Sequence, residues 1–519
     1  MNNFPAIIRS FIIYAACVVL AIWLGYMQAS PLTYSQLTIY GLLALILFFP
    51  ILLRWHYPLL LLSWHFTAVA FLLPGRPSLC LLMIVLSLGI SVLQRMLSKE
   101  SQFVTVPQIT LPILCLIGVI AFTAKMTGVG LHLFGSDVYG GKKYIYLVGG
   151  ILGYFALSAQ RIPLKRKELY LGLFFLGGIT GFIGDLLPIM PHSLYFIYYF
   201  FDVNQYAFTS EGFGGEAMRL HGAVMVADAV IWYMLAKYGL KGIFVIRKPL
   251  RWLTFMFFSV YGLFGGFRSF VVMLGLLFVM QFFLEGLHRT KLLPIFLVSG
   301  LMGAMALIPL ASRLPYTFQR ALSVLPYHVS EQARFEAQQS SEWRIQMWQA
   351  ILPQIPQYLL LGKGYVISPL DYDFVMGPEA SINSTFAQNQ GLALAEDFHS
   401  GPLSIIIPFG IWGVIAFLWF LAAGTRVLYL NYRYGDPALQ TLNTFFFANF
   451  IAQTIFFMAV FGDFSSGTLT FTSMLGLSVA FNGGVRRRVR ATQPFREMEK
   501  NQRPAGLPPS SLPAFQRRG

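Results

Sequence analysis

The sequence predicts an all-α polytopic membrane protein with about 14 transmembrane helices and one large, mostly helical loop on the outer side. Hydrophobic residues make up 56% of the chain and charged residues only 11%, whereas about a quarter of the residues in a soluble domain are charged. The mean hydropathy is +0.64. Apolar runs long enough to cross a bilayer recur along the chain, whereas a transmembrane β-barrel would have short segments of alternating polarity.

Residues 1–310 are expected to hold the first eleven helices, joined by short loops and by one longer outer segment at 188–218. No small-residue cleavage pattern follows the first apolar run, so we expect that run to remain as a helix. A polar loop at 311–401 follows, with helices near 314–326 and 330–352, and the last three transmembrane helices lie within 402–485. The predicted spans are 9–27, 35–53, 57–74, 78–94, 107–124, 144–159, 169–187, 220–236, 252–267, 269–286, 292–310, 402–423, 440–462 and 467–484.

The distribution of basic residues predicts which side each loop faces. If the N-terminus is cytoplasmic, most of the 37 Lys and Arg residues fall in short inner loops and the tail, as the positive-inside rule requires. The opposite orientation would place the basic cluster at 161–167 outside. We therefore expect both termini in the cytoplasm and the 311–401 loop on the outer face.

Residues 486–519 form an Arg- and Pro-rich tail that is predicted to be disordered and cytoplasmic. Its basic run at 486–490 directly follows the last helix, where it would contact anionic lipid. No aromatic or motif pattern there indicates nucleic-acid binding, so the formal net charge of +16 mainly reflects topology. Cys17, Cys80 and Cys115 lie in apolar runs, which predicts neither a disulfide framework nor a thiolate metal site.

Three arginines are candidates for binding an anionic group. Arg268 stands between two predicted spans, where an arginine either reaches back to water or has a function. Arg344 lies in the second loop helix, where it could instead pair with Glu342, and Arg219 precedes another span. Arginine binds phosphate through two parallel hydrogen bonds, so two or three converging arginines could hold a diphosphate. Arg313 and Arg320 are weaker candidates.

His399 lies where the large loop meets an apolar helix, close behind Glu396 and Asp397. It is either an interfacial histidine with ordinary contacts or a general base, since a neutral imidazole can accept the proton of a hydroxyl group. A metal site is not expected, because no second histidine follows at helical spacing. Asp228 is a carboxylate within a predicted span, with either a functional or a structural role.

The chain resembles the O-antigen ligase and O-antigen polymerase family, and the resemblance covers about residues 200–425. Arg344 and Trp348, followed by Pro356 and 361–365, are similar to the family's Arg-x-x-x-Trp…Pro…Gly-x-Gly pattern. His399 and Gly410 match the ligases' His-x10-Gly motif. Further similarity lies in Phe267-Arg268-Ser269, which opens a span, and in Arg219-Leu220-His221-Gly222; Val272 and Ser400 depart from the usual Leu and Asn.

The resemblance implies a glycosyltransferase of the bacterial inner membrane whose large loop is periplasmic. The donor would be a glycan on undecaprenyl diphosphate, and the acceptor a lipid A core or a growing glycan. Arg268, Arg344 and Arg219 would bind the diphosphate, and His399 would activate the acceptor hydroxyl. Glu396, Asp397, Gly410 and Asp228 would support the site, with neither a metal nor another cofactor.

Other functions remain open from the sequence. A polymerase would differ from a ligase only in its acceptor, and a protein O-glycosyltransferase is a third variant of the same chemistry. A transporter of lipid-linked saccharides would share the spans and the charge bias, but it would be expected to show internal repeats, which are not evident here. A purely structural envelope protein would leave the arginines and His399 unexplained.

Overall fold

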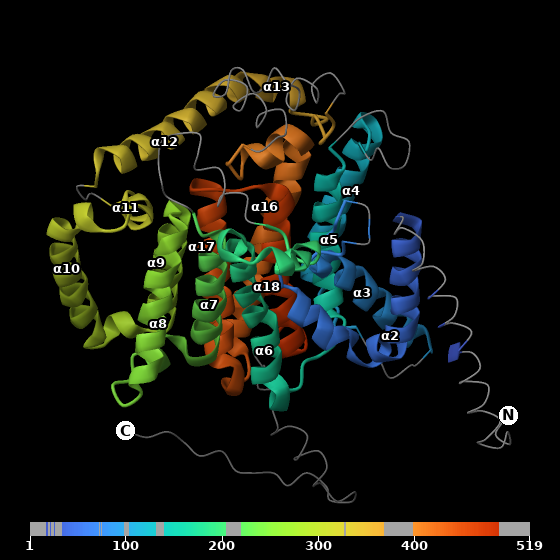
Figure 1. The fold of residues 1–519 in the computed structure, drawn as a ribbon, viewed down its shortest axis with the longest axis horizontal. Helices are drawn as coiled ribbons and strands as arrows, with labels where there is room; N and C mark the ends of the chain where they lie inside the picture. Colours follow the sequence, from blue (N-terminus) through green and yellow to red (C-terminus); the bar gives the residue numbers. More distant parts are fainter. Residues whose placement is uncertain are drawn as a thin grey trace, which may run out of the picture.

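The computed structural model describes residues 34–71, 73, 75–97, 103–130, 140–203, 219–325, 329–367 and 398–486, and also 17–18, 21 and 25. Within these residues the fold is a bundle of helices, in which the chain pairs as β-structure only at isolated bridges (Figure 1). The first half contains α2 Tyr34–Ser63, α3 Leu79–Leu97, α4 Pro107–Thr127, α5 Lys142–Ser158, η2 Leu164–Arg166, α6 Lys167–Leu176, η3 Gly177–Asp185, η4 Leu187–Ile189, η5 His192–Tyr199, α7 His221–Ile243, α8 Pro249–Tyr261 and η8 Gly262–Gly265.

The second half begins with the helix that Arg268 opens, and it includes the helices of the large loop. Its elements are α9 Arg268–Leu284, η9 Leu287–Arg289, α10 Leu292–Leu310, η10 Ala311–Arg313, α11 Tyr316–Leu322, α12 Glu331–Ile351, η11 Leu352–Gln354, α13 Ile355–Tyr358, α16 Leu403–Tyr434, η13 Pro437–Leu439, α17 Gln440–Ala459 and α18 Phe464–Asn482. Nine helical segments in the described part of the chain are long and apolar enough to cross a membrane.

The centre of the bundle is α18, in which 78% of the residues of the most apolar stretch are buried. Asp463 caps its first turn by accepting a hydrogen bond from the Ser466 N–H at 2.9 Å, and Gly483 ends it in a left-handed conformation. Gly476 allows α18 to approach α5 closely, since a Cβ atom there would lie 2.8 Å from the Leu157 Cβ. By contrast, none of the residues in the most apolar stretch of α10 is buried.

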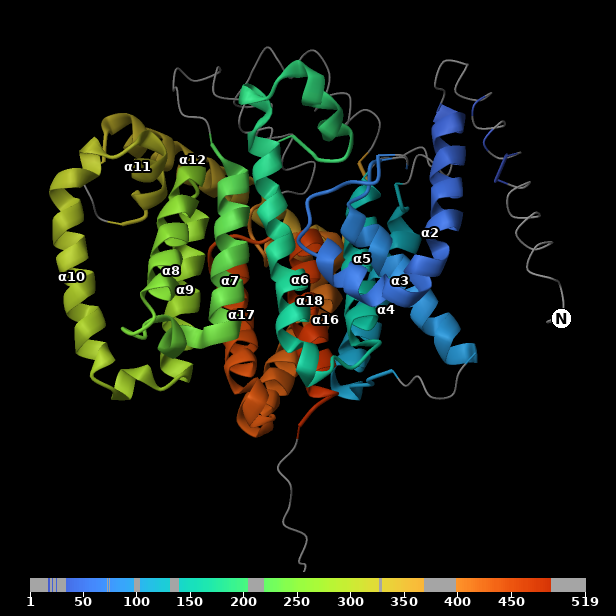
Figure 2. The ribbon, with the colours of Figure 1, turned by 60° about the horizontal axis from the view of Figure 1, so that its bottom comes forward.

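The two ends of the bundle differ in what they carry (Figure 2). Helices α11 and α12 lie across one end, η5 lies at the same end, and the connections 158–167, 243–249 and 284–292 lie at the other. At that other end Lys167 donates to the Ala438 carbonyl at 2.8 Å. The basic connections expected on the cytoplasmic side therefore share one end, opposite α12.

Two predicted spans, 35–53 and 57–74, are replaced by the single helix α2. No residue that favours a turn separates Leu53 from Tyr57, so the helix continues between them. Pro58 lies inside the helix, because a proline can bend a helix without ending it. Beyond Ser63 the chain leaves the helix and forms isolated bridges between Ala68 and Phe201 and between Val69 and Ser78. The predicted count of 14 is therefore not reproduced, and the first predicted span, 9–27, falls almost wholly outside the described residues.

The helices α11 and α12 lie where two helices were expected in the large loop. Residues 368–397 of that loop, 204–218 of the smaller one and the tail beyond 486 are outside the described residues. The predicted span 402–423 is shorter than the helix observed there, since α16 extends to Tyr434. This helix is also broken at Gly410, whose φ is 62°.

Because the basic connections share one end, we expect opposite labelling of the two ends of the bundle. In a variant that lacks the three native cysteines, Gln339→Cys on α12 should react with an impermeant thiol reagent in intact cells, and Lys165→Cys should not. Both positions are exposed, so neither result would follow from burial. Labelling of Lys165→Cys alone would show that the orientation is reversed.

Candidate functional site

Helix α12 is the element on which the candidate residues meet, and its sequence explains why it is a helix. Strong helix formers fill it, Ser330 caps its first turn by accepting from the Ala333 N–H at 3.4 Å, and Pro353 follows its end. Gln319 of α11 accepts a hydrogen bond from the Ser330 N–H at 2.8 Å. The start of α12 is thereby fixed against α11.

A second contact between α11 and α12 is the ion pair of Arg320 with Glu336, at 2.6 Å. Both side chains are largely buried, with relative exposures of 19% and 22%. Burial lowers the pKa of Arg320, while the charge of Glu336 opposes that shift. Burial, together with the nearby charge of Glu336, raises the pKa of the Tyr316 hydroxyl. Arg320 is thus occupied in holding α12, whereas Arg313 is exposed in η10.

Arg268 connects the start of α9 to the middle of α12. Its Nη1 donates to the Ala337 carbonyl and to the Ser341 Oγ, both at 3.3 Å, and its side chain is half-buried. Ser341 precedes Arg344 by three residues, which is about one turn of helix. Arg268 and Arg344 are therefore brought to neighbouring turns of α12.

His399 is held against α12 at Trp343, the residue before Arg344. Its ring lies 5.2 Å from that of Trp343 and 5.0 Å from that of Phe461, measured between centroids. Its φ of 48° is left-handed, a conformation that a residue other than glycine adopts only when its surroundings impose it. Trp348 donates from Nε1 to the carbonyl of Phe398 at 2.8 Å, so α12 fixes the backbone directly before His399.

The structure thus gathers Arg268, Arg344 and His399 along two turns of one helix. A small apolar cluster holds the arrangement together, since the buried residues Met347 and Ile351 of α12 pack with Phe398 and with the start of α16. Arg344 lies between Ser341, which Arg268 contacts, and Trp348, which contacts Phe398. Two cations and one imidazole on neighbouring turns of one helix are the groups that could stabilise a leaving diphosphate and accept a proton from a hydroxyl.

The remaining sequence candidates lie at different distances from this centre. The Arg219 guanidinium lies 5.8 Å from the ring centroid of Phe267, the residue before Arg268. Asp228 is seven residues into α7 from His221, or about 10 Å along the helix, and the structure does not bring it to the α12 centre. Glu396 and Asp397 are outside the described residues.

Gly410 acts on the backbone of α16. Its φ of 62° and ψ of −161° interrupt the helix, and the freed groups bond to the segment that follows α13. The Ile411 N–H donates to the Leu359 carbonyl at 2.7 Å, and the Lys363 N–H donates to the Ile407 carbonyl at 2.9 Å. The glycine of the His-x10-Gly motif therefore joins the end of the α12 region to the helix that follows His399.

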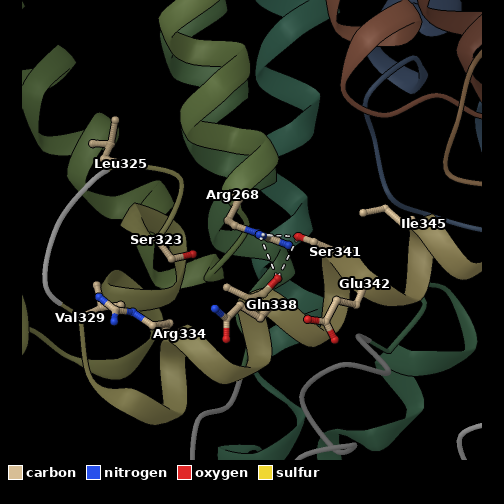
Figure 3. Close-up of a pocket in the computed structure, with 10 residues that line it drawn as sticks. Arg268, Ser323, Leu325, Val329, Arg334, Gln338, Ser341, Glu342 and Ile345 are labelled. Atoms are coloured by element: carbon tan, nitrogen blue, oxygen red, sulfur yellow. Dashed lines mark hydrogen bonds between the residues drawn. The ribbon is translucent and has the colours of Figure 1, made fainter.

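A polar cavity of about 700 Å³ lies between α12, Arg268 and the segment that joins α11 to α12 (Figure 3). Sequence reasoning missed Arg334, which contributes a second arginine to it, and also assigned no binding role to Gln338 or Glu342. Their spacing of four residues was a usable signal, since residues four apart share a helix face. The cavity is lined by Arg268, Ser323, Leu325, Val329, Arg334, Ala337, Gln338, Ser341, Glu342 and Ile345.

A second, apolar cavity of about 400 Å³ is lined in part by Ser400, the residue that follows His399. Trp348 of α12 also lines it, together with Leu418 of α16 and Met458 of α17. Its lining suits a hydrocarbon chain. No cluster of three or more His, Cys, Asp or Glu side chains that could hold a metal occurs among the described residues.

Comparison with known proteins agrees with the family suggested by the sequence motifs. We found no match among curated proteins. Residues 238–418 match the family model described as O-antigen ligase, and this region includes Arg268, Arg344, His399 and Gly410 but neither Arg219 nor Asp228. Residues 238–418 are therefore similar to the O-antigen ligase family, and this similarity supports a membrane glycosyltransferase of the ligase or polymerase type.

Proposed function

We propose that this protein moves a glycan from undecaprenyl diphosphate to an acceptor hydroxyl at the periplasmic face of the bacterial inner membrane, as an O-antigen ligase does. The observation that carries the proposal is the gathering of Arg268, Arg344 and His399 on α12. The α12 end of the bundle would be the periplasmic end, and Arg219, beside Phe267, would add to the binding of the diphosphate.

The reaction would break the bond between the anomeric carbon and the diphosphate oxygen, and the electron pair would leave with the polyprenyl diphosphate. The arginines would stabilise the charge that develops on that leaving group. His399 would accept the proton of the acceptor hydroxyl, whose oxygen forms the new bond to the anomeric carbon. These steps use only side chains of the protein and need neither a metal nor another cofactor.

Both kinds of substrate proposed here carry a lipid. The apolar cavity that begins at Trp348 and Ser400 would accept a hydrocarbon chain beside His399, and the polar cavity would face the sugars. A lipid A core as acceptor gives a ligase, and a second lipid-linked glycan gives a polymerase. The two differ in what occupies the acceptor side and share the residues on α12.

Replacing Arg268 or Arg344 by lysine should lower transfer strongly while the protein remains folded, because a compact ammonium group cannot form the two parallel bonds of a guanidinium. Transfer and donor binding would be measured on purified variants in nanodiscs, with Arg313→Lys as the matched control, since Arg313 is an exposed arginine of the same loop. The parent should remain active in EDTA. Full activity of both lysine variants, or a strict need for added divalent metal, would contradict the proposal.

A further inference from the structure

The polar cavity extends beyond the residues that the proposed transfer requires. Arg334, Gln338 and Glu342 line it from successive turns of α12 (Figure 3), so each lies about 6 Å further along the helix. Ser323, Leu325 and Val329 form the facing wall at the Arg334 end. Along α12 the side chains that line the cavity are therefore a cation (Arg334), a neutral amide (Gln338) and a carboxylate (Glu342).

Arg334 supplies a positive charge that other described residues do not neutralise. Arg320, on the neighbouring helix α11, is paired with Glu336 at 2.6 Å. Arg334 is exposed and forms no ion pair with any side chain in the described part of the chain. An exposed arginine at the end of a cavity is suited to binding a carboxylate or phosphate group.

Arg334 is also displaced from the place where the proposed diphosphate would bind. Arg268 contacts α12 at Ala337 and Ser341, three and seven residues beyond Arg334, which corresponds to about 5–10 Å along the helix. This separation suits a group carried on the glycan better than the second phosphate of the same diphosphate.

We propose that this cavity is a subsite for the donor glycan and that Arg334 binds an acidic group, a carboxylate or a phosphate, carried by one of its sugars. Gln338, which lies between Arg334 and Ser341 along α12, would form hydrogen bonds with sugar hydroxyls between that group and the diphosphate. The inference rests on the proposed function, and it assigns to the protein a preference for acidic over neutral glycans.

The test compares short prenyl diphosphates that carry disaccharides differing only at the terminal sugar, which is glucose, glucuronate or glucose phosphate. Binding would be measured on the full chain in nanodiscs. The parent should bind an acidic donor about tenfold more tightly than the neutral one, a difference of about 1.4 kcal/mol. Arg334→Gln should abolish this preference without weakening the neutral donor, Arg334→Glu should reverse it, and Arg313→Gln should leave it unchanged. The two acidic donors distinguish a carboxylate site from a phosphate site.

Two further probes separate this inference from the proposed function. A sugar-free prenyl diphosphate, tested against the prenyl alcohol, reports on the diphosphate site alone, and Arg334→Gln should not change its binding. The lipid-free acidic and neutral disaccharides report on the Arg334 subsite alone. Equal binding of acidic and neutral glycans by the parent would overturn the inference. So would an equal loss of all donors in Arg334→Gln, because Arg334 would then bind the diphosphate itself.

Discussion

Replacing His399 by alanine should lower the rate of glycan transfer by about 10²–10⁴-fold, the usual contribution of general acid–base catalysis. Donor binding should persist, because the proposed diphosphate ligands are arginines. His399 contacts Trp343 and Phe461 through its ring, so its removal also leaves a space between them. His399→Gln, which fills more of this space, should be similarly inactive if the lost function is proton transfer.

The pH dependence provides an independent test of the same role. Only neutral imidazole accepts a proton, so transfer by the parent should decline as the pH falls through the range in which histidine becomes protonated, ordinarily near about 6.5. The acidic limb should be absent from the residual activity of His399→Ala. His192→Ala is the matched control, because His192 lies in η5 on the same end of the bundle and packs against Tyr195 at 4.8 Å between ring centroids. Lost donor binding without an acidic limb would make His399 a structural or donor-site residue.

Replacing Gly410 by alanine should destabilise the protein and abolish most transfer, although Gly410 lies beyond His399 in the chain. Its φ of 62° and ψ of −161° fall in a region that is open almost only to glycine, at a cost of about 1–3 kcal/mol for other residues. An added Cβ atom would also lie 2.5 Å from the Leu359 carbonyl oxygen. Relief of this contact would displace the segment after α13 from α16.

The measurements for Gly410→Ala are thermal unfolding and transfer in nanodiscs. Gly303→Ala is the control, because Gly303 lies in α10 with no atom within 4 Å of the added Cβ position, and alanine favours a helix. The control should match the parent in stability and transfer. A Gly410→Ala protein as stable and active as the parent would show that the break in α16 is not needed.

Long apolar runs made most helices predictable, because a membrane helix depends on a local property of the sequence. The exception is α2, where two spans were predicted and one helix is found. Hydropathy alone does not distinguish two successive spans from one helix that continues through Pro58. Arg268, Arg344 and His399 were identified from their motif context. Arg334 was missed because α12 is polar on several faces, and only the packing of α11 against it defines which face lines the cavity.

The role of Gly410 illustrates a different limit of sequence reasoning. Its offset from His399 was visible in the sequence, and this suggested support for the site. Its partner Leu359 is separated from it by about fifty residues, and nothing in the local pattern of either segment specifies their hydrogen bond. A contact of this kind requires knowledge of how distant segments pack.

The offset of seven residues from Ser341 to Trp348 sets the distance between two contacts of α12. Arg268 contacts the first and the backbone before His399 contacts the last, so their spacing is set by about two turns of helix, roughly 10 Å. Insertion or deletion of one residue between them would rotate one contact by about 100° relative to the other. A related chain that keeps both contacts must therefore keep the number of residues between them, or change it by about one full helical turn. The identity of the intervening side chains does not affect this requirement.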